Sequence, residues 1–187
     1  MSPFVTLFSD RLCLRQWRDE DREAFAAMNS DARVMKFFRS RLSRAESDAM
    51  VDGIQKHFSE HGFGLWAIEV PRVARFIGFS GLAVPRFRAL FTPCVEVGWR
   101  LAFEHWGHGY ATEAARLALG YGFGTAALPE IVSYTSATNH RSRAVMERLG
   151  MRRDPADDFD YPTMPEGHPL RAHVLYRLGS GSYFGMR

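Results

Sequence analysis

Residues 94–123, CVEVGWRLAFEHWGHGYATEAARLALGYGF, join three elements in one continuous stretch. The alternation of residues 95–101 predicts a strand, and the apolar and small residues from near Thr112 through Leu119 predict a helix. Between them, residues 106–111 contain two glycines and predict a turn. This strand–turn–helix unit is the part of the sequence that decides the fold.

The turn also indicates a ligand. Gly107 and Gly109 precede the helix, where a curled backbone can point several N–H groups at one spot. The helix dipole adds about half a positive charge there. A phosphate or pyrophosphate fits such a site, and the glycines alone do not say which compound carries it.

Composition limits the classes of protein that need to be considered. The chain has 187 residues, 46% of them hydrophobic and 24% charged, and its net charge of +3 is too small to indicate nucleic-acid binding. We expect one domain with a sizeable core. Cys13 and Cys94 lie in apolar runs, as expected of reduced thiols in a cytoplasmic protein. No run approaches the roughly 18 apolar residues of a membrane span, and we expect neither an export signal nor a membrane partner.

The remaining elements flank this unit on both sides. Residues 11–17 predict a strand, and Asp19 is expected to cap a helix that ends near Met28. Ser43 and Glu46 form a capping-box pattern for a helix over residues 44–60, and residues 65–70 and 75–83 predict a hairpin. After the unit come a strand over residues 131–137, a helix over 140–149 capped by Asn139, and a strand over 173–178.

This order of elements predicts an α/β (α+β) fold. A mixed, mostly antiparallel sheet of six to seven strands would contain one parallel crossover pair, with helices on both faces. Residues 154–170 are rich in Pro and acidic residues and predict a binding loop or a mobile flap. We expect residues 181–187 to form a loosely held tail.

Two phosphate-binding motifs compete for the glycine turn. A dinucleotide site requires an acid about 20 residues further on, at the end of a strand, whereas Glu130 precedes its strand. A Walker A loop requires Gly-Lys-Ser/Thr, and Gly122-Phe-Gly124-Thr lacks the lysine. The Walker loop is rejected, and the dinucleotide enzyme is kept as the less favoured alternative.

A third possibility rests on a resemblance. Glu96-Val-Gly-Trp-Arg-Leu101, Trp106-Gly-His-Gly-Tyr-Ala-Thr-Glu-Ala114 and Asn139-His-Arg-Ser142…Leu149-Gly-Met151 occur in order. These motifs resemble those of the GNAT superfamily of acetyl-CoA-dependent N-acetyltransferases, and most of all the group named for ribosomal-protein-alanine N-acetyltransferases. The resemblance covers roughly residues 8–180 and implies a single GNAT domain whose central parallel strands splay apart. His108 stands where a lysine is common.

The resemblance implies acetyl-CoA as co-substrate and an amine as acceptor. The pantetheine arm would lie beside the strand, near main-chain groups of Val97, Gly98, Trp99 and Leu101. Gly98 suggests a bulge or a close approach there. The pyrophosphate site would be formed by Trp106, Gly107, His108, Gly109, Tyr110, Ala111 and Thr112. Asn139 and Ser142 would contact the pantetheine, and Asn139 fits a helix cap equally well.

Acetylation requires a neutral amine to attack the thioester. Glu96 is the candidate base, with a structural salt bridge to Arg100 as the alternative role, and a main-chain N–H near residues 97–99 is the candidate oxyanion donor. The family's usual acid, a tyrosine, is replaced by Met146, which leaves Ser142 as a weaker acid and Tyr134 as another if it faces the cleft. A protein that binds acyl-CoA with little catalysis, such as a sensor, therefore stays open.

The acceptor is not identified by these motifs. Acidic side chains in the long connection are candidates for attracting a cationic amine: Asp154, Asp157, Asp158, Asp160 and Glu166. His173, Phe37, Phe38 and Trp66 are candidate pocket residues. The pair His105 and His108 lacks the Glu of a zinc motif, so no metal is expected. The protein is expected to be a monomer or a homodimer.

Overall fold

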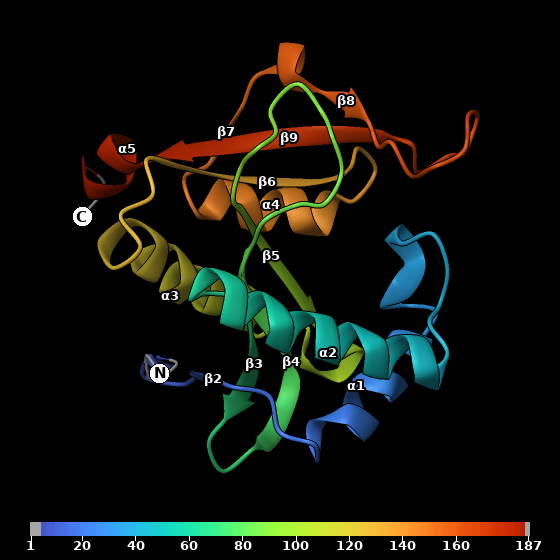
Figure 1. The fold of residues 1–187 in the computed structure, drawn as a ribbon, viewed down its shortest axis with the longest axis vertical. Coiled ribbons are helices and arrows are strands. Elements are labelled where there is room, and N and C mark those ends of the chain that lie inside the picture. The colour runs from blue at the N-terminus through green and yellow to red at the C-terminus, as the bar shows by residue number, and fades with distance from the viewer. Residues whose placement is uncertain (1–4, 186–187) are drawn as a thin grey trace.

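A computed structural model describes residues 5–185. Figure 1 shows helices packed around one continuous sheet. The strands are β1 (Leu7–Phe8), β2 (Cys13–Arg15), β3 (Leu65–Val70), β4 (Ala74–Ala83), β5 (Glu96–Leu101), β6 (Glu130–Ser136), β7 (Arg152–Arg153), β8 (Phe159–Asp160) and β9 (Ala172–Gly179). The helices are α1 (Asp21–Ser30), α2 (Arg44–His61), α3 (Tyr110–Gly124), α4 (His140–Arg148) and α5 (Ser180–Gly185), with short 3₁₀ turns η1 (Met35–Phe37), η2 (Phe103–His105) and η3 (Pro155–Asp157).

The sheet has the predicted mixed character. Its order is β1-β2-β3-β4-β5-β6-β9-β7, with β8 also paired to β9. Every pairing among the described strands is antiparallel except that of β5 with β6, which is parallel. It has nine strands rather than six or seven because three two-residue strands, β1, β7 and β8, extend its edges.

Helices cover both faces of the sheet, as expected. Phe79 of β4 packs edge-to-face on Phe25 of α1, with ring centroids 6.0 Å apart. Leu82, three residues further along β4, lies beside Gly122 of α3, where a Cβ would come within 3.0 Å of its side chain. Because successive strand residues point to opposite faces, α1 and α3 lie on opposite sides of the sheet.

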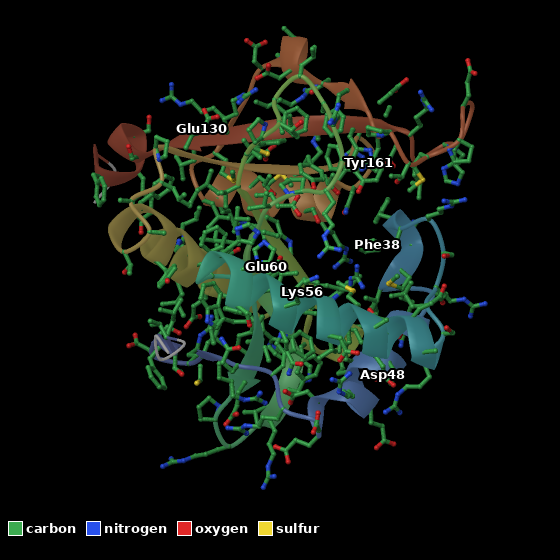
Figure 2. All side chains as sticks on the ribbon, viewed as in Figure 1. Phe38, Asp48, Lys56, Glu60, Glu130 and Tyr161 are labelled. Carbon is green, nitrogen blue, oxygen red and sulfur yellow. The ribbon has the colours of Figure 1, made fainter. Side chains whose placement is uncertain are left out.

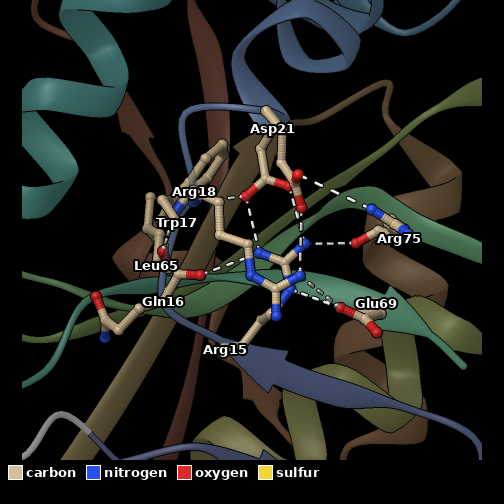
Figure 3. Close-up of polar contacts among 9 residues, drawn as sticks. Arg15, Gln16, Trp17, Arg18, Asp21, Leu65, Glu69 and Arg75 are labelled. Carbon is tan, nitrogen blue, oxygen red and sulfur yellow. Dashed lines mark hydrogen bonds and ion pairs between the residues drawn. The ribbon is translucent and has the colours of Figure 1, made fainter.

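The first helix begins differently from the prediction. Asp19 does not cap α1, whose N-cap is Glu20 and makes no side-chain cap bond. Asp21 instead receives two bonds of 2.8 Å from the guanidinium of Arg15, which also contacts Glu69 (Figure 3). This buried ion pair joins β2, α1 and β3, and it provides a nonlocal anchor for the start of the helix.

The other predicted caps are confirmed. Ser43 and Glu46 form both bonds of a capping box at α2, and Gly62 ends that helix in the left-handed conformation. Asn139 caps α4 by accepting a bond from the N–H of Ser142. Both features depend only on neighbouring residues, so the sequence pattern was sufficient to predict them.

The C-terminal part is more ordered than expected. Residues 154–170 are not a featureless loop, because η3 and β8 lie within them and β8 pairs with β9. The expected loose tail is also corrected. Residues 180–185 form α5, and Tyr183 is buried with its ring 4.7 Å from that of Phe123. Residues 186–187 lie outside the described part.

Within the described residues, both cysteines are free thiols and half-buried. Burial raises the pKa of Cys94 to about 11, so its thiol stays protonated near neutral pH. Among residues 5–185, no helix is long and apolar enough to cross a membrane.

Candidate active site

The parallel strands β5 and β6 separate along their length. Their pairing is limited to the register of Glu96 with Val132, where the Val132 N–H donates to Val95 O at 2.9 Å. At the next step a side chain replaces the main-chain bond, because Ser133 Oγ donates to Val97 O. The strands therefore form a V that is closed beside Glu96 and open toward the carboxyl ends of both strands.

The open side of β5 presents unpaired main-chain groups. Gly98 O accepts from Ser80 of β4, whereas Val97 O faces β6, so the main chain of Trp99 also faces β6 by alternation. Within the described residues, the N–H and C=O of Trp99 have no partner on β6, because the pairing of β5 with β6 ends at Glu96 and Val132. Leu101 O, the next group on this side, accepts from the Trp106 indole at 2.8 Å.

Gly98 itself lies beside open space. A Cβ added there would meet no atom within 4 Å. The expected bulge is absent, since the β4–β5 register continues unbroken through Gly98. The glycine therefore leaves room on one face of β5 rather than bending the strand.

The glycine turn has the conformation that its sequence indicates. Gly107 and Gly109 have φ of 83° and 81°, in the left-handed region that favours glycine. Helix α3 begins at Tyr110, two residues before the expected start. The first hydrogen bond of the helix runs from the Glu113 N–H to Gly109 O. The N–H groups of Tyr110, Ala111 and Thr112 precede that bond and have no acceptor within the helix. They are the groups that the sequence predicts to bind an anion.

A residue from the start of the chain holds this turn in place. Arg11 donates through Nε to Glu113 at 2.8 Å and through Nη1 to His108 O at 3.1 Å. Ser9 Oγ also donates to Glu113, at 2.7 Å. The sequence reasoning missed this clamp, and no local pattern indicates it because its partners lie about a hundred positions apart.

The start of α4 lies beside the same turn. The Arg141 guanidinium lies over the Trp106 ring, 5.2 Å from its centroid. Asn139 Nδ2 donates to Thr135 Oγ1 at 2.9 Å and to Ser142 Oγ at 3.1 Å. The structure therefore brings together the turn and the Asn139–Ser142 helix start, although the Asn139 amide already bonds within the protein.

Glu96 lies at the closed end of the V. Protein atoms enclose most of its carboxyl group, and this burial raises its pKa to about 7, while a hydrogen bond from Tyr134 acts in the opposite direction. Burial and the nearby Glu96 raise the pKa of Tyr134 far above its usual range. The expected alternative, a salt bridge from Glu96 to Arg100, is absent from the described part of the chain.

An aromatic cluster surrounds this end of the site, and the sequence reasoning found only part of it. Neighbouring rings in this cluster have centroids 4.7–6.4 Å apart, and they belong to Phe87, Phe91, Tyr134, Phe159, Tyr161 and His173. The density of aromatic residues in the two connecting segments was the only available signal. His173 belongs to this cluster, and burial lowers its pKa.

One candidate for the acceptor pocket is not supported. Trp66 is a core residue, 1% exposed, and packs on Phe58 and Tyr121. Met146, which stands where the family's tyrosine acid is usual, is likewise buried in the core, at 1% exposure. Among the described residues, no group of three or more His, Cys, Asp or Glu side chains is arranged to hold a metal ion.

The acidic segment is largely neutralised. Arg153 pairs with Asp158, Arg171 Nε lies 2.9 Å from Asp160, and Arg177 Nε lies 2.7 Å from Asp157. These ion pairs hold the segment against β9. They disfavour the hypothesis that its carboxylates attract a cationic amine.

A comparison with known proteins identifies the family. The profile described as "Acetyltransferase (GNAT) domain" matches residues 11–152. The chain belongs to the GNAT family. It is an acetyltransferase, and enzymes of this family transfer an acetyl group from acetyl-CoA to amines.

Individual relatives agree with this assignment. The chain is 32% identical over 173 residues to the FsC-acetyl coenzyme A-N(2)-transacetylase of Aspergillus fumigatus, covering 87% of this chain and 71% of that enzyme. It superposes on an acetyltransferase from Agrobacterium tumefaciens with a TM-score of 0.75 and 29% sequence identity. The match covers 95% of this chain and 96% of that one. Mycobacterium smegmatis RimJ in complex with CoA-disulfide shares the fold, with a TM-score of 0.75 and 20% sequence identity. The match covers 96% of this chain and 89% of that one.

The dinucleotide alternative does not fit this GNAT arrangement. Glu130 begins β6 instead of ending a strand, and its carboxylate binds Arg177 Nη1 at 2.8 Å. Figure 2 places Glu130 at the opposite end of the β6–β9 layer from Tyr161. With one parallel pair in the sheet, the doubly wound arrangement that such a site requires is also missing.

Proposed function

We propose that this GNAT enzyme transfers an acetyl group to a primary amine of a small molecule or a protein N-terminus by direct attack in a ternary complex. The observation that carries the proposal is the V between β5 and β6, with the half-buried Glu96 at its closed end and unpaired helix N–H groups at its mouth. Such a channel suits a long cofactor with a charged head and a reactive thioester tail.

The cofactor would run along β5. The unpaired main chain of Trp99 is the best available partner for the pantetheine amides. Val97 and Leu101 flank it on the same edge, and Gly98 leaves room beside it. The pyrophosphate would bind the turn formed by Trp106, Gly107, His108, Gly109, Tyr110, Ala111 and Thr112. Asn139 and Ser142 would face the cofactor from the other side.

Glu96 is the proposed general base. A pKa of about 7 leaves a large fraction of its carboxyl ionised near neutral pH. This carboxylate can accept a proton from the acceptor's ammonium group, directly or through water, so that the neutral amine attacks the thioester. Ser142 is the candidate acid for the departing thiolate. Its oxygen accepts from Asn139, and no described residue takes its hydroxyl hydrogen.

The motifs also favour a finer grouping with the ribosomal-protein-alanine N-acetyltransferases. The fold likeness to RimJ is compatible with this grouping, although at 20% identity it concerns the fold alone.

Calorimetric titration with acetyl-CoA, followed by a thiol-release screen of amines and peptides, tests the proposal. We expect micromolar binding and release of CoA with at least one primary amine. Failure to bind at tens of micromolar would reject the proposal. Binding without release for any amine would favour the sensor alternative instead.

A further inference from the structure

Arg100 shares one face of β5 with Glu96. Alternate strand residues point the same way, so Glu96, Gly98 and Arg100 lie in a row, with the outer two about 13 Å apart at the usual rise per residue. Across the sheet, Arg100 pairs with Phe79, whose ring packs against α1. The row therefore faces the side on which α1 lies, with open space at its centre beside Gly98.

The charge of Arg100 has no acidic partner among residues 5–185. A guanidinium offers five N–H donors, and Arg100 uses one of them, from Nη1 to Asn29 Oδ1 at 2.6 Å. Its Nε is buried and has no acceptor in that part of the chain. Burial lowers the pKa of Arg100 to about 10, which still leaves the side chain charged at neutral pH.

The protein nevertheless fixes the orientation of this guanidinium. Its central carbon lies 4.0 Å from the centroid of the Phe38 ring and 5.4 Å from that of Phe79. Asn29 is fully buried and donates to Ser47 of α2 at 2.8 Å, so the acceptor that holds Nη1 is itself held. An immobilised guanidinium with spare donors is a preorganised receptor for a planar carboxylate.

The surroundings of this receptor are positively charged. Phe38 belongs to the segment that follows η1, and Figure 2 shows it on the same side of the molecule as Tyr161. Arg39 and Arg41 from that segment, together with Lys36 of η1, form no ion pair with any described residue. Exposed cations alone would be an ordinary solvated surface, but Arg39 directly follows Phe38, and the Phe38 ring contacts the half-buried Arg100, which has no acidic partner among residues 5–185.

We infer that the acetyl acceptor is an amine that also carries a carboxylate, and that Arg100 binds this carboxylate while the amine lies near Glu96. The inference rests on the proposed function, because it assigns the second anchoring point of the same acceptor. It names amino acids and acidic peptides as the substrate class. The separation along β5 favours acceptors whose amine and carboxylate are several bonds apart.

The test compares matched acceptors. Amino acids with the amine at the far end of chains of increasing length would each be assayed against the carboxamide of the same length, by CoA release. We expect kcat/KM to favour the acid by about tenfold or more at one chain length at least, mainly through KM, since a hydrogen bond to a charged group is worth that much. Equal kcat/KM values for acid and carboxamide at every length would overturn the inference.

Variants locate the effect. Arg100→Met should abolish the preference, and Arg100→Lys should retain part of it. The matched control Arg39→Met should keep the preference and only alter its salt dependence. If Arg100→Met folds and keeps the wild-type ratio of kcat/KM for acid over carboxamide, the inference is also overturned. If this variant does not fold, the comparison of acids with carboxamides in the wild-type enzyme is sufficient to test the inference. Loss of acetyl-CoA binding in the wild type would reject the proposed function itself, which separates the two failures.

Discussion

At the scale of single residues, the proposed role of Glu96 as the base predicts how activity depends on pH. Burial holds its pKa near 7, so the basic form is lost as the pH falls below that value. We expect kcat/KM to drop about tenfold per pH unit below pH 7, and Glu96→Gln to lower it by about a hundredfold or more and to remove this inflection. Pre-steady-state and steady-state thiol release across pH 5.5–9 measures both effects.

The matched control is Glu60→Gln, because Glu60 is an exposed acid on α2 (Figure 2). Its profile should follow the wild type at every pH. An unchanged rate for Glu96→Gln throughout the range would show that Glu96 is not the base.

The same carboxyl affects stability in the opposite direction from activity. Its pKa is higher in the folded state than the ordinary 4.5, so ionisation costs stability as the pH rises from about 4.5 to 7. At about 1.36 kcal/mol per pKa unit, Glu96→Gln should become more stable than the wild type by up to roughly 3 kcal/mol at pH 8. Urea unfolding at pH 5 and pH 8 measures the change, and a pH-independent difference would contradict it.

At the scale of elements, the turn before α3 depends on a left-handed residue. A Cβ at Gly109 has room, since its nearest contact would be Arg11 Nη2 at 3.5 Å, but a φ of 81° costs an L-residue about 1–2 kcal/mol. We expect Gly109→Ala to relax the turn, misdirect its N–H groups and weaken acetyl-CoA binding about tenfold by calorimetry. Gly124→Ala, near the end of the same helix, has no such strain and should bind as the wild type does.

The start of α1 depends on the buried pair of Arg15 and Asp21, whose side chains are 6% and 1% exposed. Asp21→Asn would leave the buried arginine with less compensating charge, and we expect it to lower the free energy of unfolding by about 3 kcal/mol. Denaturant titration measures this loss. The control Asp19→Asn changes a side chain that is 95% exposed, and a comparable loss there would refute the explanation.

At the scale of the whole molecule, the last described helix belongs to the folded unit. Tyr183 is 8% exposed, whereas its neighbour Phe184 is 52% exposed. We expect Tyr183→Ala to reduce the free energy of unfolding by about 3 kcal/mol and Phe184→Ala to change it by less than about 1 kcal/mol. A loss for Tyr183→Ala as small as that for Phe184→Ala, in both thermal and denaturant unfolding, would mean that α5 contributes no packing.

Features that depend on neighbouring residues were predictable from the sequence. The capping box of Ser43 and Glu46, the cap at Asn139 and the left-handed glycines of the turn each follow from a few adjacent positions. The alternation of β5 and the crossover to β6 similarly specified the parallel pair. The family motifs then indicated where a cofactor would lie.

Features that depend on distant residues were not predictable. Arg15 and Asp21 form their pair only because β2 and α1 meet in three dimensions, and Asp19 was the better cap by local pattern alone. The contact of Tyr134 with Glu96 requires the register of β5 against β6, which no periodicity specifies. The missing partner of Arg100 could be recognised only once every nearby acid had been placed.

The clamp from Arg11 and Ser9 to Glu113 gives the turn a thermodynamic link to the start of the chain. Any ligand that favours the ordered turn must, by reciprocity, favour the docked position of residues 9–11 by the same free energy. If the cofactor binds this turn as proposed, its binding should therefore protect residues 9–11 from proteases, and docking of these residues should strengthen cofactor binding. Protease sensitivity of residues 9–11, which lie far from the motifs in sequence, would then indicate whether the proposed cofactor site is occupied.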